Sequence, residues 1–210
     1  MPRVSQAHLD AKRRQIIEGA KRTFTRNGFH ASSMQDVLGE TGLSAGALYR
    51  YFKGKDELIL AVAAEAFTQM REAFESAIHE KPLRPLHDVI AGVLDVAFTK
   101  QSEAAGAPDP QAFPRLIIQV WGEAARNEPL RQALIDGYVR MRGIWGELIA
   151  MYQEAGQLRT DIPTDHIVRT LMAVAQGFII QKALFGDDAG EVISEGLRAL
   201  TTMRAEETEG

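Results

Sequence analysis

Residues 32–58, SSMQDVLGETGLSAGALYRYFKGKDEL, constrain the fold of this chain more than any other segment. Ser32 or Ser33 can cap a first helix, in which apolar side chains recur at the i, i+3 and i+4 spacing of one helix face. Gly42 then stands where only glycine adopts a left-handed backbone cheaply, and Ser44 can cap a second helix. The segment therefore predicts two short helices joined by a tight turn, with a third helix starting at its end.

The second of these helices has two different faces. Its inward positions are Leu43, Ala47, Leu48 and either Phe52 or Tyr51. Its outward positions are Ala45, Gly46, Tyr49 and Arg50. Small residues allow close approach to a partner, and Tyr and Arg supply donors for phosphate groups and base edges. Such an outer face is suited to the floor of the major groove of DNA.

Together these residues resemble the TetR family of transcriptional regulators. The resemblance rests on Gly28-Phe29, Ser33, Val37-Leu38, the run from Gly42 to Phe52, Lys55 and Leu58. It covers residues 10–60, and beyond residue 60 only the length and the run of helices fit. It implies an all-α fold of about nine helices. A three-helix, helix-turn-helix DNA-binding domain is expected at residues 8–57, with the motif at about 33–52, and a helical effector-binding and dimerisation domain at residues 58–205.

The residues expected to contact DNA follow from this resemblance. They are Ser32, Ser33, Gln35, Ser44, Ala45, Gly46, Ala47, Tyr49, Arg50, Tyr51 and Lys55. Ala47 departs from the family, which usually has Thr or Ser at this position, and two neighbouring residues are too small to offer side-chain hydrogen bonds. Base recognition is therefore expected to depend on Tyr49, Arg50, Gln35 and methyl contacts, so the operator sequence stays open.

Charge is distributed unevenly along the chain. The net charge of −4 alone argues against a nucleic-acid partner. Residues 1–56, however, hold ten Lys and Arg against five Asp and Glu, whereas the whole chain holds 24 against 28. A basic end on an acidic body is the electrostatic pattern of a DNA-binding head, although a chance bias would look the same. Lys12, Arg13 and Arg14 could reach a DNA backbone or could form a solvated basic face.

The rest of the chain predicts helices only, because no period-two alternation flanked by turn residues is present. Outside the short pair, helices are expected at residues 8–27, from about 55 to 79, at 86–102, from about 114 to 127, from 129 to 156, from about 164 to 185 and after 188. A loop is expected at residues 102–110. The domain boundary is expected inside the helix that starts near residue 55, rather than at Pro82 and Pro85.

The helix expected at about 164–185 is apolar on more than one face, so it needs cover from two sides. A second copy of the chain would supply one cover, and the family resemblance implies that the last two long helices of each subunit form a dimer interface. Its candidate residues are Ile167, Leu171, Val174, Phe178, Leu184, Val192 and Leu197. The alternative is the central core helix of a monomer. A dimer would place two recognition helices about one helical turn, ~34 Å, apart on a palindromic site.

Aromatic, methionine and amide side chains gather on the helices that follow residue 86. The candidates for an effector site are Phe98, Phe113, Gln119, Trp121, Tyr138, Met141, Trp145, Met172, Gln176 and Phe178. A mostly apolar cavity with a few polar groups is typical of a small-molecule site, and the resemblance implies one without naming the effector. Core packing is the alternative for any single residue. Arg115, Glu123 and Arg142 could pair with a charged ligand or face solvent.

Catalytic and metal-binding functions find little support in the sequence. Without cysteine, the chain has no disulfide, no cysteine-ligated zinc and no thiol catalysis. The five histidines form no HExxH and no pair at i, i+4, and no Gly-rich phosphate loop or GxSxG occurs. We therefore expect neither an enzyme nor a metal or other cofactor.

Membrane and secretion signals are also missing from the sequence. No apolar run reaches the ~20 residues of a spanning helix, and the N-terminus is polar, so a cytoplasmic protein without a membrane partner is expected. The favoured interpretation is a homodimeric repressor that a small, largely apolar effector releases from a palindromic operator. Two alternatives stay open: an architectural or activating DNA-binding protein without an effector, and a helical interaction module that no longer binds DNA. The expected partners are an operator duplex, a second copy of the chain and an unidentified small molecule.

Overall fold

In the computed structural model, which describes residues 5–79, 82–104, 111–186 and 189–201, the chain forms helices joined by short connections, and these residues contain no strand. The helices are α1 Gln6–Asn27, α2 Met34–Thr41, α3 Ala45–Tyr51, α4 Lys55–His79, α5 Leu86–Ala104, α6 Ala112–Ala124, α7 Glu128–Glu154, α8 Thr164–Phe185 and α9 Ala189–Thr201. The all-α fold class expected from the sequence is confirmed. Several helix ends differ from the expected ones by a few residues. α5 extends into the loop expected at 102–110, whose remaining residues 105–110 lie outside the described part, and α6 begins at residue 112 and ends before residue 127.

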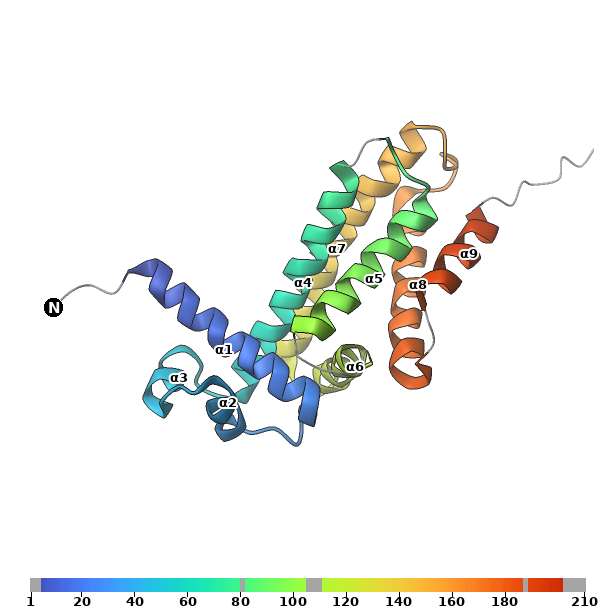
Figure 1. Cartoon of the computed structure of the whole chain (residues 1–210). Helices are drawn as coiled ribbons and strands as arrows, with labels where there is room; N and C mark the ends of the chain where they lie inside the picture. The colour runs from blue at the N-terminus through green and yellow to red at the C-terminus, as the bar shows by residue number, and fades with distance from the viewer. Residues whose placement is uncertain (1–4, 80–81, 105–110, 187–188, 202–210) are drawn as a thin grey trace, which may run out of the picture.

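Figure 1 shows a small head at one end of a larger body. α1, α2 and α3 form the head, while α8 and α9 lie at the side of the body away from α2 and α3. Two helices connect head and body: α4 packs on α1, α5 and α7, and α6 packs on α1 as well as on α5, α7 and α8. α4 crosses the boundary expected at residue 57 without a break, so the division into two domains stays a prediction.

The ends of the two short helices in the head follow from their local sequence. The Ser33 hydroxyl accepts a hydrogen bond from the N–H of Asp36, and the Asp36 carboxylate accepts one from the N–H of Ser33 at 2.7 Å. This capping box satisfies two backbone donors that would otherwise lack partners. Gly42 ends α2 with a φ of 66°, and Ser44 caps α3 by accepting from the N–H of Ala47. The predicted helix, turn and second helix are therefore confirmed.

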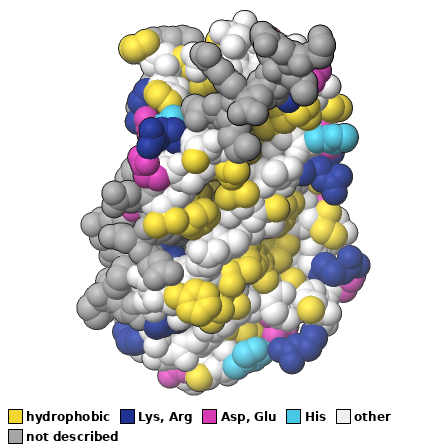
Figure 2. All heavy atoms as spheres, turned by 90° about the vertical axis from the view of Figure 1, so that its right-hand side faces the viewer, with side chains coloured by type: hydrophobic (Ala, Val, Ile, Leu, Met, Phe, Trp, Pro, Cys, Tyr) yellow, Lys and Arg dark blue, Asp and Glu magenta, His cyan; other side chains and the backbone are white. Residues whose placement is uncertain are grey.

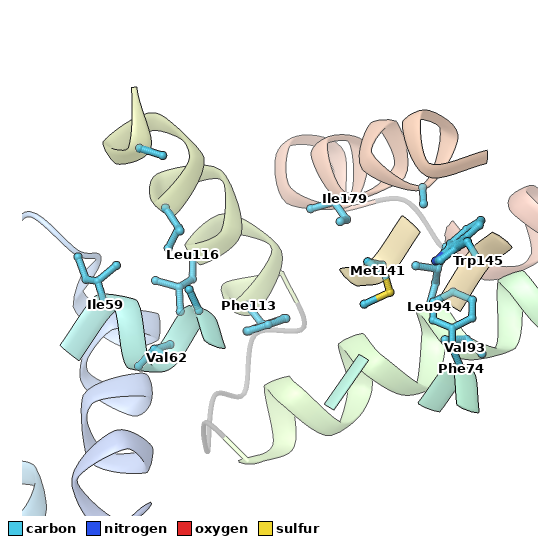
Figure 3. Packing of buried hydrophobic residues seen from close by; sticks show 14 of the residues in the cluster. Ile59, Val62, Phe74, Val93, Leu94, Phe113, Leu116, Met141, Trp145 and Ile179 are labelled. Carbon is cyan, nitrogen blue, oxygen red and sulfur yellow. The ribbon is translucent and has the colours of Figure 1, made fainter. Parts of the chain in front are cut away.

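Apolar side chains hold α3 onto the head and bind the body helices together. Leu48 of α3 is buried together with Ile16 of α1. In the body, Phe74 of α4 packs against Trp145 of α7 with 4.8 Å between the ring centroids, beside Leu94 of α5 (Figure 3). Each fully buried side chain of this kind contributes about 1.5–3 kcal/mol to stability. The burial of Leu48 also determines that the opposite side of α3 faces outward.

α8 carries apolar residues all round but is buried on one side only. Val168, Ala175 and Ile179 are buried where α8 packs on α6 and α7. By length and mean hydropathy alone α8 could cross a membrane, and 28% of its most apolar stretch is buried within the chain. Two side chains predicted at a dimer interface, Leu171 and Leu197, are instead buried in their own chain, at 7% and 5% exposed. They belong to the core because α8 packs on the body and α9 packs on α5.

Candidate functional site

The outer face of α3 consists of small residues followed by Tyr and Arg. The exposed members of the predicted DNA-contact set on and beside this helix are Ser44, Ala45, Gly46, Tyr49 and Arg50. Ala47 and Tyr51 are half-buried, at the edges of this face. Tyr and Arg side chains that project from a helix with little bulk at its start can approach a groove closely and donate to base edges or phosphates.

The two adjacent serines that precede α2 differ in exposure. Ser33 and Gln35 are exposed, so both can face a ligand of the head. Ser32 is only 3% exposed, and its hydroxyl donates to the carbonyl oxygen of Gly28 at 2.7 Å. The Ser32 side chain thus holds the connection between α1 and α2, and a DNA contact at Ser32 stays a prediction. Ser33, and not Ser32, is the cap of α2.

Lys55, at the first position of α4, also holds the connection between α1 and α2. Its ammonium group donates to the carbonyl oxygens of Phe29 at 3.1 Å and Ser32 at 2.9 Å, and it lies 4.4 Å from the centroid of the Phe29 ring. Nothing in the sequence pattern suggested this internal role. A phosphate contact by Lys55 stays a prediction, and it would have to share the ammonium with these carbonyls.

Part of the positive charge of the head is already paired. Arg22 donates to one Glu40 oxygen at 2.7 Å, and Arg26 donates to the other at 3.0 Å. The hydrogen bonds from Arg22 and then Arg26 hold the pKa of the Glu40 carboxyl below its ordinary value. These two arginines therefore connect α1 to α2, which leaves exposed residues such as Arg50 and Lys53 as better candidates for attracting DNA.

The body contacts the head at the turn that follows α1. Gly28 ends α1 with a φ of 78°, and the backbone N–H of Phe29 donates to the side-chain oxygen of Gln119 in α6 at 2.6 Å. Gln119 was expected in an effector site; its amide holds the head and it is not a wall residue of the cavity described next, so an effector contact by Gln119 stays a prediction. Beside this contact, Glu123 of α6 accepts from Arg126 at 3.1 Å and lies 3.6 Å from the ring of His30.

A cavity of about 120 Å³ lies in the body between α4, α5, α6, α7 and α8. Its wall is apolar except for a few groups, and it includes these residues of the predicted effector set: Phe113, Trp121, Tyr138, Met141, Trp145, Met172 and Gln176. Other wall residues were not predicted, among them Val62, Phe67 and Met70 of α4. Their helical spacing is typical of a buried face, and a sequence pattern does not distinguish a packed interior from a cavity wall.

Two further members of the predicted effector set fall elsewhere. Phe178 is half-buried, packs against the buried core and is not part of the cavity wall. The side chain of Phe98 lies outside the part of the chain that the structure describes.

The charged residues that could have met a ligand are used elsewhere. Arg142 pairs with Asp165 at 2.7 Å, and Glu123 pairs with Arg126. Arg115 donates to the carbonyl oxygen of Ala183 at 3.2 Å. No charged side chain belongs to the cavity wall among the described residues. The polar groups there are the Tyr138 hydroxyl, the Gln176 amide and the indole nitrogens of two tryptophans, and burial raises the pKa of Tyr138 to about 12.

An apolar surface covers the outer side of α8 and α9. Figure 2 shows hydrophobic side chains gathered on this side of the molecule. Its most exposed members are between 60% and 69% exposed, namely Leu184, Phe185, Val192 and Leu200. Leu184 and Val192 were predicted at a dimer interface, and Phe185 and Leu200 were not. On α8, the predicted interface residues Ile167, Val174 and Phe178 are half-buried. We call the four most exposed residues the α8–α9 patch.

Two family models match the chain. The model described as bacterial regulatory proteins, tetR family, matches residues 16–62. The model described as the C-terminal part of a BetI-type transcriptional repressor matches residues 96–202, which is more than half of the chain. The first match contains α2, α3 and the Gly28 turn, and the second contains α6, α7 and α8.

Curated relatives span nearly the whole chain. YfiR of Bacillus subtilis, an uncharacterized HTH-type transcriptional regulator, is 28% identical over 98% of both chains. AcnR of Corynebacterium efficiens, an HTH-type transcriptional repressor, is 27% identical over 90% of both chains.

Solved structures show the same fold. GusR of Salmonella enterica has a TM-score of 0.70 at 22% identity and covers 96% of this chain and 97% of its own. FadR of Bacillus subtilis, solved in complex with stearoyl-CoA, has a TM-score of 0.71 at 19% identity and covers 91% of this chain and 99% of its own.

Proposed function

Because the chain belongs to the TetR family of transcriptional repressors and is not an enzyme, we propose that it acts as a homodimer in the cytoplasm, binds a palindromic DNA site and leaves it when a small, largely apolar effector enters the body. The head at residues 8–57 would bind DNA, and the body at 58–205 would bind the effector and the second subunit. The observation that carries this proposal is the position of α6, which forms part of the cavity wall and also holds the head through Gln119.

DNA binding is assigned to the outer faces of α2 and α3. Tyr49 and Arg50 would contact base edges and phosphates, while Ala45 and Gly46 let α3 approach the groove. Ser33 lies at the start of α2, where free amides and the helix dipole favour a phosphate. One short helix makes few contacts, so tight binding requires two heads on one site.

The second head is assigned to a second copy of the chain, held through the α8–α9 patch. Leu184 and Phe185 extend from the end of α8, and Val192 and Leu200 belong to α9. Exposed apolar side chains that gather on two neighbouring helices are typical of a covered interface. A two-fold dimer would bring the same patch of each subunit together, because the interface of such a dimer is formed by identical surfaces.

The effector would act through α6. Phe113, Val120 and Trp121 of this helix line the cavity, and Gln119 between them holds the backbone of Phe29. The carbonyl oxygen of Phe29 accepts a hydrogen bond from Lys55 at the start of α4. A shift of α6 would therefore change the contacts of the head with both α6 and α4. Release follows only if the effector prefers the shifted conformation, and then DNA and effector weaken each other equally, typically by about 1–3 kcal/mol.

The nature of the ligand is supported by the cavity and by one solved relative. FadR holds stearoyl-CoA, so this fold accommodates a ligand with a large apolar part. The cavity here is apolar but much smaller than such a chain, at about 120 Å³. The rival candidate is a DNA-binding protein that needs no effector, and a fully packed body would have favoured it.

DNA binding is tested by selecting duplexes from a random pool and measuring the affinity of the best site across a salt series. We expect the affinity to fall steeply with salt, because phosphate contacts release counterions. Arg50→Ala and Tyr49→Ala should each weaken binding about 10-fold or more. Arg159→Ala is the matched control, since Arg159 is exposed in the turn between α7 and α8. Equal affinity for all three variants and the unchanged protein would contradict the assignment of α3 to the groove.

A further inference from the structure

One polar group in the cavity wall has no partner. The indole Nε1–H of Trp145 is buried, and within the described part of the chain no side chain or backbone group accepts a hydrogen bond from it. Trp145 is 2% exposed and packs against Phe74, beside Leu94 and Met141 of the same wall (Figure 3). A buried donor without an acceptor destabilises a protein, so such groups in native proteins usually have a functional or structural explanation.

The other polar groups of the wall are also neutral. The Tyr138 hydroxyl keeps its proton at all ordinary pH values, because burial raises its pKa to about 12. Gln176 contributes an amide, and the remaining wall residues are apolar or, like Trp121, aromatic. A charged group placed here would lose its hydration without gaining a counter-charge, which is strongly unfavourable.

One charged group, the ammonium of Lys21, lies near a wall residue without belonging to the wall. It lies 5.7 Å from the centroid of the Phe113 ring and is not part of the cavity wall. Phe113 itself belongs to the wall and Lys21 does not, so the ammonium is not one of the groups that line the cavity.

The cavity has room for a small ligand. A cavity of about 150 Å³ is known to hold a benzene molecule, and the cavity here is about 120 Å³. Taking the cavity as the effector site proposed above, we infer that the effector is a neutral molecule of about the size of one aromatic ring, with a hydrogen-bond acceptor that binds the Nε1–H of Trp145. A carbonyl oxygen is the simplest such acceptor.

Four probes of nearly the same shape separate the possibilities: acetophenone is neutral with an acceptor, cumene is neutral without one, benzoate is an anion and benzamidinium is a cation. Binding is followed by tryptophan fluorescence, because both tryptophans of the chain, Trp121 and Trp145, lie in the cavity wall. We expect the two neutral probes to bind at least about 10-fold more tightly than the two ions. Benzoate or benzamidinium binding as tightly as acetophenone, or no saturable binding of either neutral probe, would overturn the inference.

Trp145→Phe tests the hydrogen bond itself, because it keeps an aromatic ring and removes the N–H. It should weaken acetophenone about 5- to 10-fold more than it weakens cumene, because the smaller ring alters the wall for both probes. Trp121→Phe is the matched control and should not distinguish the two probes. An equal effect of Trp145→Phe on both probes, or no effect on either, would contradict the assigned acceptor.

A measurement on the unchanged protein covers the case in which Trp145→Phe does not fold. The chain has two tryptophans, so its NMR spectrum holds two indole N–H signals, which Trp121→Phe assigns. Acetophenone should move the Trp145 signal downfield, and cumene should not. The same downfield shift with both probes would overturn the hydrogen bond. The probe-binding tests use no DNA, so they do not depend on operator release. Release is tested separately: a probe that binds in the cavity and leaves the DNA affinity unchanged would contradict the proposed release but not the binding site.

Discussion

Gln119 accepts a hydrogen bond from the backbone N–H of Phe29 at 2.6 Å, so a helix of the cavity wall directly holds the turn that leads into α2. Gly28 makes this contact possible, since a Cβ atom there would lie 3.3 Å from the Gln119 oxygen and the φ of 78° disfavours any side chain. The head is therefore connected to the body by a polar contact that a small shift of α6 would break.

Gln119→Leu should leave the N–H of Phe29 without an acceptor. We expect the free energy of unfolding to fall by about 1–3 kcal/mol, because the amide is partly buried. Gln119→Glu keeps an acceptor oxygen, so its free energy of unfolding should be close to that of the unchanged protein. The measurement is denaturant unfolding followed by circular dichroism, with Gln132→Leu on the exposed surface of α7 as the control. Equal stability of the Leu and Glu variants would show that the contact carries no energy.

Lys55→Met distinguishes an internal role of this lysine from a phosphate contact. Because its ammonium donates to the carbonyl oxygens of Phe29 and Ser32, we expect a loss of about 1.5–3 kcal/mol in stability. The slope of DNA affinity against salt should then stay unchanged. If Lys55 binds a phosphate instead, the slope should fall by about one unit while stability stays nearly constant. Arg159→Ala, at an exposed position between α7 and α8, is the control for both measurements.

The local features of the head could be predicted, because each depends on a few neighbouring residues. A left-handed glycine at Gly42 and a serine cap at Ser44 leave signatures that short-range sterics and hydrogen bonding explain. The choice between Ser32 and Ser33 could not be made, since both fit the pattern and only the packing of the preceding turn separates them.

Contacts between distant segments had no comparable signature. Gln119 and Phe29 are far apart in the sequence, and a glutamine on an amphipathic helix fits a ligand contact, a solvent contact or a polar link equally well. The apolar faces of α8 and α9 were recognised, but periodicity does not tell which face a neighbouring helix covers. Leu171, predicted at the interface, is therefore buried in its own chain, whereas the exposed Phe185 was not among the predicted interface residues.

Leu184→Glu tests the assignment of the α8–α9 patch to a dimer interface. A charge in a covered apolar interface loses its hydration, so we expect the dimer dissociation constant to rise at least about 10-fold. The helical content should not change, because Leu184 is exposed within its own chain. Sedimentation at several concentrations gives the oligomeric state. Val139→Glu is the matched control, since Val139 is 64% exposed on α7. The same sedimentation for both variants would contradict the interface.

Lys21→Met tests the cost of a buried ammonium. Lys21 is 2% exposed, its Nζ has no hydrogen-bond partner among the described residues, and burial lowers its pKa below 10.5, with Glu18 and Glu65 opposing the shift. We expect the variant to be more stable than the natural protein by about 1 kcal/mol at neutral pH.

The pH dependence of this difference follows from the direction of the shift. Above the lowered pKa, folded Lys21 is neutral, whereas unfolded Lys21 keeps its proton until the pH approaches 10.5. The unfolded state then binds more protons, so the natural protein gains stability as the pH rises through this range and the advantage of Lys21→Met shrinks. Urea unfolding at about pH 7 and about pH 10 measures both values. A constant difference would mean that Lys21 is not destabilised in the folded chain.

The arrangement of two heads on one DNA site is tested most directly by a hydroxyl-radical footprint of the protein on its selected duplex. We expect two protected segments, related by two-fold symmetry and centred about one helical turn, ~34 Å, apart. Leu184→Glu should remove both segments together at concentrations where the unchanged protein protects them. A single protected segment, or protection without preference for any sequence, would contradict a dimer that binds one palindrome through two α3 helices.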